Sequence, residues 1–249
     1  MTSGALQARG LTKAFGELLV LDGVDLSAAP GSVLSVLGPS GCGKSTLLRL
    51  LAGFEAPTSG EVLQDGVRVT GPSPSRGMVA QAGGLFPWLS LRDNLAFGPR
   101  AQGASRAEVA DVVGDLLGRT GLEGFADSLP RQLSGGMRQR GSIAQVLASR
   151  PPVLLLDEPF AALDAQTRLR MHEWLGHLLA ARPTTTVLVT HDVEEALLLG
   201  DRLALLSARP AAVVEELPVP FGPERGRAVL ADPSFVRLKS EVLDRVLSA

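Results

Sequence analysis

The sequence of 249 residues contains no tyrosine and a single cysteine, and its charges nearly balance. The lone Cys42 excludes a disulfide framework within the chain and suits a reducing compartment. The formal net charge of −2 argues against a dedicated nucleic-acid binder, because such proteins usually carry a basic excess. We therefore expect no nucleic-acid partner.

Long apolar runs are also missing. The uninterrupted ones are short, such as Val153 to Leu156, whereas a membrane-spanning helix needs roughly 18 to 20 apolar residues. The opening MTSGALQARG lacks the apolar segment of a signal peptide. If this protein acts at a membrane, another chain is expected to supply the membrane-spanning part. Hydrophobic residues at 45% and charged residues at 20% are typical of an ordinary globular protein.

What the chain does contain is a glycine-rich loop, GPSGCGKS, at Gly38 to Ser45. It fits the phosphate-binding pattern G-x-x-x-x-G-K-[ST], with the apolar run Val33 to Leu37 before it and a helical pattern after it. Glycines let successive N–H groups converge on one anion, beside the positive end of the next helix. Lys44 is predicted to bridge the terminal phosphates, and Ser45 to be a ligand of Mg²⁺.

The loop thus predicts a nucleoside triphosphate site, rather than a turn that only joins a strand to a helix. Cys42 within it is interpreted as a small residue that the loop tolerates, not as a redox switch. The residues predicted to hold the nucleotide phosphates are consecutive: Gly38, Pro39, Ser40, Gly41, Cys42, Gly43, Lys44, Ser45 and Thr46.

Alternating apolar residues over 6–26 and 61–69, with a hairpin turn at Asp65-Gly66, predict a small antiparallel sheet. Short apolar runs predict buried strands that end near Gln81, Leu156, Thr190 and Leu206. Helices are predicted over 105–120, from Ser134, and over 165–181, 192–200 and 232–249. The helices between about 85 and 150 interrupt the strands, which indicates an inserted lobe.

Two stretches carry large apolar residues without a regular period. Phe15 lies in a turn-like setting, where the local pattern favours a buried side chain that fills the core at the edge of the sheet. The segment Gly83–Gly98, which contains FPWLS, is too irregular for a strand or a helix core. It is predicted to be a loop that either docks on a partner or is buried under its own domain, and the local pattern does not choose between these two.

Asp157 and Glu158 follow the apolar run Val153 to Leu156, at the strand end where α/β sheets bind ligands. Asp157 is the carboxylate that a phosphate-binding loop requires to hold Mg²⁺, directly or through water. Glu158 is predicted to polarise, or take a proton from, a water behind the terminal phosphate. The competing interpretation is a capped strand end without a catalytic role.

With LSGGMRQR at Leu133 to Arg140, DEPFAALD at Asp157 to Asp164 and the isolated His191, the chain resembles the ATPase subunit of an ATP-binding cassette (ABC) transporter. The resemblance covers nearly the whole chain, and the LSGG element discriminates it from other NTPases. It implies an α/β fold: a P-loop NTPase core with a mostly parallel sheet and flanking helices, a small antiparallel β subdomain and an inserted helical lobe. It also implies that Gly38–Ser45 is the Walker A loop and that the cofactors are ATP and Mg²⁺.

The resemblance assigns further roles. Phe15 matches the aromatic residue that stacks on adenine, where the family more often has tyrosine. Gln81 matches the glutamine that touches the metal and the attacking water, and His191 the histidine that contacts the terminal phosphate. Asp164 matches a loop of the ATP-bound dimer. The signature residues that would cap the phosphate bound to the opposite subunit are Ser134, Gly135 and Gly136.

The start of a helix at residues 134–136 is itself a second anion site, and one nucleotide in one compact lobe has no need of two. We therefore expect two copies arranged head to tail around ATP. The resemblance also implies partners: multi-spanning permease subunits that meet the Leu85 to Leu91 segment and, indirectly, a solute-binding protein. It places the chain peripherally on the cytoplasmic face of the inner (plasma) membrane.

Within the family, the FPWLSLRDN segment and the last helix resemble those of importers of nitrate, sulfonates, taurine and similar small solutes.

The expected ATPase domain spans 5–230, with core segments 5–84 and 151–208 and a lobe at about 85–150. Residues 231–249 are expected to form a C-terminal helix on the core. Two alternatives remain: an ABC-type ATPase in DNA repair, translation or cell-division signalling, and an exporter cassette. His172 and His177 match no motif and are expected to be surface or helix residues.

Overall fold

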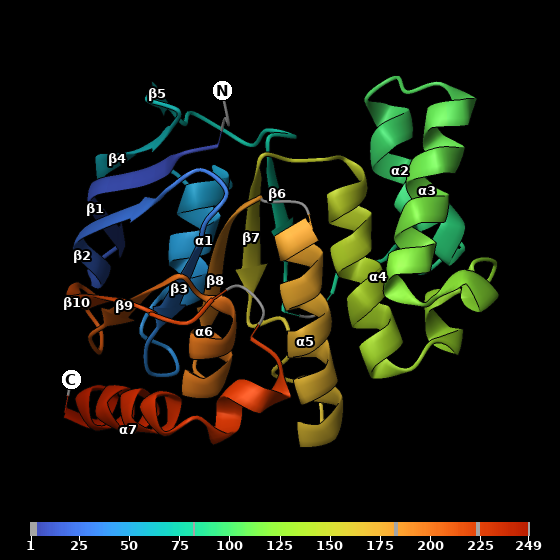
Figure 1. Cartoon of the computed structure of the whole chain (residues 1–249). Helices are drawn as coiled ribbons and strands as arrows, with labels where there is room; N and C mark the ends of the chain where they lie inside the picture. The colour runs from blue at the N-terminus through green and yellow to red at the C-terminus, as the bar shows by residue number, and fades with distance from the viewer. Residues whose placement is uncertain (1–3, 82, 182–183, 223–224, 249) are drawn as a thin grey trace.

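The computed structural model describes residues 4–81, 83–181, 184–222 and 225–248. Its strands form two sheets, and Figure 1 shows the smaller sheet on one side of the molecule and the helical lobe on the other. This arrangement confirms the predicted α/β class with a small antiparallel sheet and an inserted lobe.

The smaller sheet has the order β2-β1-β4-β5 and is antiparallel throughout. The predicted hairpin turn is present, with Asp65 and Gly66 at φ 51° and 79°, the positive values that a tight two-residue turn requires. The strands are β1 (Leu6–Phe15), β2 (Leu18–Ala28), β4 (Ser59–Gln64) and β5 (Val67–Arg68).

The larger sheet has the order β10-β9-β3-β8-β7-β6, and the five strands from β9 to β6 are parallel. No strand is predicted after the one that ends near Leu206, yet β10 pairs antiparallel with β9. It is an edge strand, so its last residue, Pro218, need not donate to a further neighbour. The strands are β3 (Val33–Leu37), β6 (Arg76–Val79), β7 (Val153–Asp157), β8 (Thr185–Thr190), β9 (Arg202–Leu206) and β10 (Val213–Pro218).

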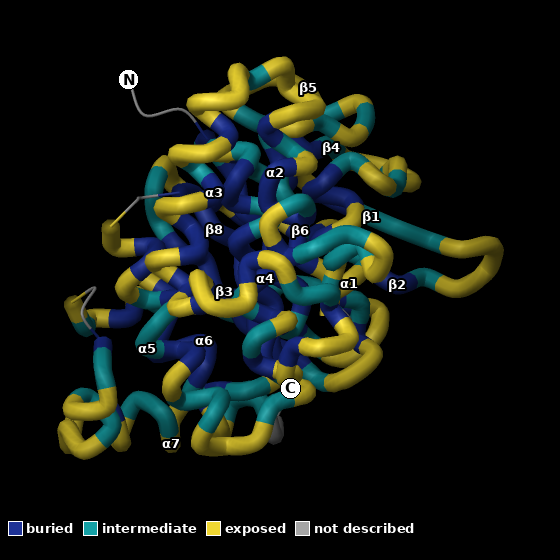
Figure 2. The backbone as a smooth tube through the Cα atoms, turned by 90° about the vertical axis from the view of Figure 1, so that its right-hand side faces the viewer, coloured by how far each residue is buried: buried dark blue, intermediate teal, exposed yellow. Residues whose placement is uncertain are grey.

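Side chains that alternate along β7 divide the core into two halves. Val153 and Leu155 pack with helix α1 (Lys44–Ala52), while Leu154 and Leu156 pack with the lobe helices and α5 (Ala165–Ala181). Both faces of the parallel strands are therefore covered, as their continuous apolar runs predict. Figure 2 shows the buried backbone gathered in the middle of the molecule.

The lobe consists of α2 (Leu91–Ala101), α3 (Arg106–Thr120), the short η1 (Glu123–Phe125) and η2 (Pro130–Gln132), and α4 (Gly135–Ala148). The capping box of Ser105 with Glu108 is present, and Ser134 caps α4 by accepting the N–H of Met137.

The loop predicted over Gly83–Gly98 is wrong in its second half, because α2 begins at Leu91. Ser90 caps that helix, and Pro99 lies inside it. The apolar residues of the segment divide: Leu91 and Leu95 are buried, whereas Trp88 is 72% exposed.

The C-terminal part of the chain packs on the core through a buried cluster that joins β9, α6 and α7. Helix α6 (Val193–Leu199) follows β8, and helix α7 (Pro233–Ser248), preceded by η3 (Arg227–Ala231), lies against it through the buried Phe235 and Val242. Residue 249 of the expected helix lies outside the described residues. No helix in the described ranges is both long and apolar enough to cross a bilayer.

Candidate active site

Three of the parallel strands end at one edge of the larger sheet, where the chain carries its polar motifs. The glycine-rich loop follows β3, Asp157 and Glu158 end β7, and His191 follows β8. In Figure 1 the strand arrow of β7 points to this edge, at the bottom of the view. Because parallel strands share this direction, segments far apart in the sequence are brought together there.

The glycine-rich loop is built as predicted, with one difference. Gly41 and Gly43 have φ 77° and 130°, and a Cβ on Gly43 would lie 2.9 Å from a methyl group of Val20. Gly38 has no positive φ; it is needed because a Cβ there would lie 3.1 Å from both the Cys42 sulfur and Leu206. Close packing, not backbone freedom, explains that glycine.

Lys44 is buried at the first position of α1, and its Nζ donates to the carbonyl oxygens of Gly38 at 2.8 Å and Pro39 at 3.0 Å. These bonds fold the lysine back over its own loop. The same Nζ lies 3.5 Å from Oε1 of Glu158. The predicted phosphate-binding lysine and the predicted base are therefore neighbours.

Ser45 and Asp157, the two predicted metal ligands, are in contact: the serine hydroxyl donates to Asp157 Oδ1 at 3.0 Å. Burial raises the pKa of Asp157, and the charge of Glu158 raises it further; the Ser45 hydrogen bond and the Lys44 charge act in the opposite direction. A cation at this carboxylate would favour its ionised form. Hydroxyl and carboxylate oxygens are the donors that Mg²⁺ prefers, so the residues present fit that metal.

Glu158 lies at the centre of the cluster. Its Oε2 is 3.0 Å from Nδ1 of His191 and 3.4 Å from Nε2 of Gln81. Its backbone has φ 43°, unusual for a residue other than glycine, and is held by a hydrogen bond from its N–H to the Val189 carbonyl at 3.0 Å. Such local strain is found at functional sites and requires support from the surrounding structure.

Phe15 at the end of β1 is 47% exposed, so its interpretation as a buried core residue is wrong. The Nζ of Lys13 lies 4.7 Å from the centroid of its ring, in the geometry of a cation–π contact. The side chain is thus oriented and open to solvent, as a residue that stacks on a base would be.

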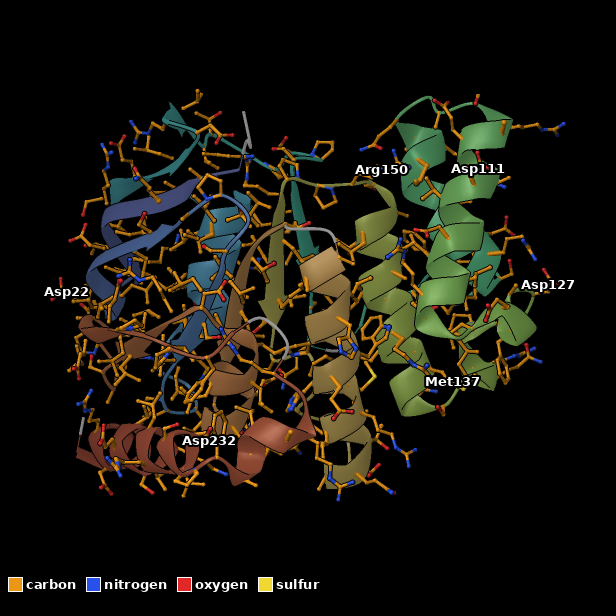
Figure 3. All side chains as sticks on the ribbon, viewed as in Figure 1. Asp22, Asp111, Asp127, Met137, Arg150 and Asp232 are labelled. Carbon is orange, nitrogen blue, oxygen red and sulfur yellow. The ribbon has the colours of Figure 1, made fainter. Side chains whose placement is uncertain are left out.

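The signature residues 134–136 do not contact the phosphate-binding loop, although Gly135 lines a cavity together with Gln81. In the described chain no hydrogen bond or ion pair joins them to residues 38–46. Helix α1 packs on one face of the larger sheet and α4 on the other. Met137 lies in the first turn of α4, and Asp22 lies on β2, the strand whose Val20 packs against the glycine-rich loop. Figure 3 shows these two residues on opposite sides of the molecule.

Asp164 is exposed and accepts the N–H of Thr167 at 3.0 Å. That backbone hydrogen bond is the main cause that lowers the pKa of Asp164, so the carboxylate stays ionised at the start of α5. Within one copy its observed role is therefore that of a helix cap.

Both histidines that match no motif lie on α5, as expected of surface or helix residues: His172 is buried and His177 is exposed. At the start of α6, Asp192 accepts the N–H groups of Glu194 and Glu195. The buried carboxylate of Glu195 accepts the hydroxyl of Thr190.

One residue at the site was not predicted. The guanidinium of Arg209 donates to the carbonyl of Gly41 in the glycine-rich loop. Arg209 belongs to the turn between β9 and β10, which also hydrogen-bonds to β2 through Ala211. No sequence motif marks it, because only the tertiary fold brings this turn to the loop.

Comparisons with known proteins agree on one family. The model of a family described as ABC transporter matches residues 21–161. A taurine import ATP-binding protein of Roseobacter denitrificans is 46% identical and aligns with 91% of this chain and 86% of its own length. A nitrate import ATP-binding protein of Synechocystis is 43% identical, with 91% of this chain and 88% of that protein aligned.

The solved dimeric structure of the ABC transporter cassette MJ0796 superposes with a TM-score of 0.76 at 31% identity. The match covers 87% of this chain and 100% of that one. A second structure of the same cassette, bound to ADP and phosphate in a post-hydrolysis state, gives a TM-score of 0.74.

Proposed function

The chain belongs to the ABC transporter family, and from this premise we propose that it hydrolyses ATP at the edge of β3, β7 and β8 to drive the import of a small solute. One observation carries the proposal. The carboxylate of Glu158 lies between Lys44 at 3.5 Å and His191 at 3.0 Å, directly after the strand that ends in Asp157.

For nucleotide binding, Phe15 would stack on adenine, and the N–H groups of residues 38–46 would hold the phosphates. Lys44 would leave its bonds with Gly38 and Pro39 for the terminal phosphates. Positive φ at Gly41 and Gly43 supports a concave run of N–H groups.

Ser45, Asp157 and Gln81 would hold Mg²⁺ together with the phosphates. When bound, the ion neutralises charge on the phosphates.

For hydrolysis, Glu158 would act as the general base and His191 would position the terminal phosphate. A base must lie within hydrogen-bond reach of the water it activates and be held in place. Contacts with Lys44, His191 and Gln81 orient the carboxylate of Glu158 from three sides. The nucleophile is the water, and its proton passes to Glu158.

We propose that the working form contains two copies. Residues 134–136 start α4, where the Ser134 hydroxyl accepts the N–H of Met137, but they make no hydrogen bond or ion pair to the phosphate-binding loop among the residues described. Ser134, Gly135 and Gly136 would close over the ATP bound to the other copy, with Asp164 at the same interface. The superposed structure of the cassette MJ0796 is a dimer.

The proposed membrane partner is a multi-spanning permease, which meets the segment Leu85 to Leu91. Asn94 in α2 shapes this segment: its amide donates to three backbone carbonyls at 3.0 to 3.2 Å, and its oxygen accepts the N–H of Phe86 at 2.7 Å. Gln145 of α4 also donates to that oxygen, at 3.2 Å. This support lets Trp88 stay exposed, as a docking residue would be.

A groove between α2 and α3 continues the same surface. It has a volume of about 380 Å³, an apolar floor and three arginines, Arg92, Arg100 and Arg106, along it. Arg92 and Arg100 are already paired with Asp127 and Asp93, so an amphipathic permease segment would match the groove chiefly in shape. The chain would thus lie peripherally on the cytoplasmic face of the inner membrane.

The solute is proposed from the relatives alone: taurine, another sulfonate, or nitrate. A solute-binding protein would deliver it to the permease. A strain that lacks the gene can be grown on each compound as the sole source of sulfur or nitrogen. The compound on which growth fails identifies the solute.

We also propose the domain limits 5–230 for the ATPase domain and 231–249 for the terminal helix.

The substitution Glu158→Gln tests the proposed function. It removes the base but keeps the size and hydrogen-bonding capacity of the side chain, so ATP should still bind while hydrolysis falls by roughly 100-fold or more. Steady-state phosphate release and nucleotide titration measure the two quantities. Glu241→Gln, at an exposed position of α7, is the matched control. A Glu158→Gln protein with the wild-type rate would remove Glu158 from its role.

A further inference from the structure

A buried polar pair lies behind the proposed catalytic residues and takes no part in the hydrolysis described above. His172 of α5 and Glu195 of α6 are each 3% exposed, and His172 Nε2 lies 3.7 Å from Glu195 Oε1. Among the described residues, neither ring nitrogen of His172 nor Oε1 of Glu195 has a hydrogen-bond partner. A buried polar group destabilises the folded state unless another polar group satisfies it. We therefore treat His172 and Glu195, whose unsatisfied atoms face each other, as one pair.

This pair is connected to His191 through Thr190. The second carboxylate oxygen of Glu195 accepts the hydroxyl of Thr190, the residue just before His191. The same hydroxyl oxygen accepts the N–H of Asp192, just after it, at 3.0 Å. Glu195 thus holds the chain on both sides of His191.

The pair is also connected to the strand end that carries Glu158. Phe160, two residues further on, is fully buried, and its ring lies 5.4 Å from the ring of His172. The imidazole therefore packs under both segments that supply the proposed catalytic groups. It lies in the interior and touches no residue of the phosphate-binding loop among those described.

We propose that His172 is a positioning residue for ATP hydrolysis: its imidazole holds Glu195, and through Thr190 it fixes His191 beside Glu158. This inference rests on the proposed function of the site. Without the imidazole, Oε1 of Glu195 would lose the ring nitrogen that lies 3.7 Å from it, and its carboxylate would rotate and carry Thr190 with it. The 3.7 Å separation exceeds a hydrogen bond by about half an ångström, so a small approach of α5 and α6 completes the bond.

The test compares His172→Leu with His172→Gln. Leucine removes the polar group, and we expect kcat for ATP to fall roughly 10- to 100-fold, as small misplacements of catalytic groups do. KM for ATP and the melting temperature should stay close to wild type, because His172 does not touch the nucleotide. Glutamine can donate to Glu195 and should restore most of kcat. His177→Leu, an exposed histidine of the same helix, is the matched control.

Two results would overturn the inference. One is an unchanged kcat in His172→Leu. The other is a loss of kcat that accompanies an equal loss of thermal stability and that glutamine does not restore, because His172 would then be only a core residue. Glu158→Gln, assayed in parallel, separates this inference from the proposed function: if Glu158→Gln also hydrolyses ATP normally, the site assignment fails as a whole.

Discussion

Adenine recognition would depend on Phe15, which stands at the position where the family more often has tyrosine. Its ring is half exposed, and Lys13 lies over it at 4.7 Å from the centroid. The cation occupies one face, so a base would stack on the other. Phenylalanine offers the same π-face as tyrosine but no hydroxyl, and its contribution would therefore come from stacking alone.

We expect Phe15→Ala to weaken ATP binding and Phe15→Tyr to preserve it. Stacking of a base on an aromatic side chain contributes about 1–3 kcal/mol, which corresponds to roughly a 5- to 150-fold change in Kd. Titration with a fluorescent ATP analogue measures the effect. Phe54→Ala is the control, since Phe54 is also about half exposed but belongs to the α1–β4 connection. Equal affinity of Phe15→Ala and wild type would refute the stacking role.

At the scale of elements, helix α2 explains a feature that local pattern left open. Its N-terminal half supplies Asn94, which ties the preceding loop into a fixed shape, and its buried residues Leu91 and Leu95 anchor the lobe. The aromatic residues that remain outside are then free for a partner. Rings of Phe86 and Phe97 pack together at 4.7 Å, so the exposed surface is ordered before any partner binds.

We expect Trp88→Ser to reduce association with the permease at least tenfold while ATP hydrolysis by the isolated subunit stays normal. Large aromatic side chains often dominate the binding energy of an interface. Val67→Ser on β5 is a close control, because Val67 is 71% exposed and Trp88 72%. Co-purification with the membrane subunits measures the effect. If Val67→Ser weakened the complex and Trp88→Ser did not, the docking surface would lie elsewhere.

At the scale of the whole molecule, each chain has two helix N-termini that the proposed dimer would use, at α1 and at α4. The two helices pack on opposite faces of the larger sheet, and α1 follows the phosphate-binding loop. Two copies arranged head to tail, as proposed, would bring each α4 start to the phosphates bound to the other copy. ATP would then stabilise the dimer because it would bind both chains, and hydrolysis would weaken it.

Gly135→Asp tests this arrangement. A Cβ at Gly135 would meet only Leu163, at 3.8 Å, and an acidic residue is favourable in the first turn of a helix, so the single copy should stay folded. Its charge would repel the phosphates of the other copy's ATP. In the Glu158→Gln background with ATP, light scattering should show dimers, and adding Gly135→Asp should leave single copies.

Gly124→Asp places the same charge elsewhere on the lobe, at a glycine with open space around it, and should leave the dimer intact. Dimers that persist with Gly135→Asp would contradict the composite site. Single copies in the ATP-bound Glu158→Gln protein would contradict it more directly.

The sequence predicted the elements with strong local patterns. The strand Val33–Leu37 and the helix Ala165–Ala181 agree residue for residue with the structure, since apolar runs and helical spacing act over a few neighbours. It missed both β10 and α2. In β10, prolines obscured a strand that only pairing with β9 stabilises, and in α2, Pro99 and the aromatic residues hid the helical spacing.

The sequence by itself determined the family and the phosphate-binding loop, because their residues are consecutive and each acts through its own backbone. Only the tertiary structure decided what meets Glu158 and what supports His191. Lys44, Gln81, His172 and Arg209 are far apart in the chain, and the contacts they make depend on strand order and helix packing. Burial likewise follows from the fold: His172, unmarked in sequence, is in the core, while Phe15, which the local pattern alone placed inside, is exposed.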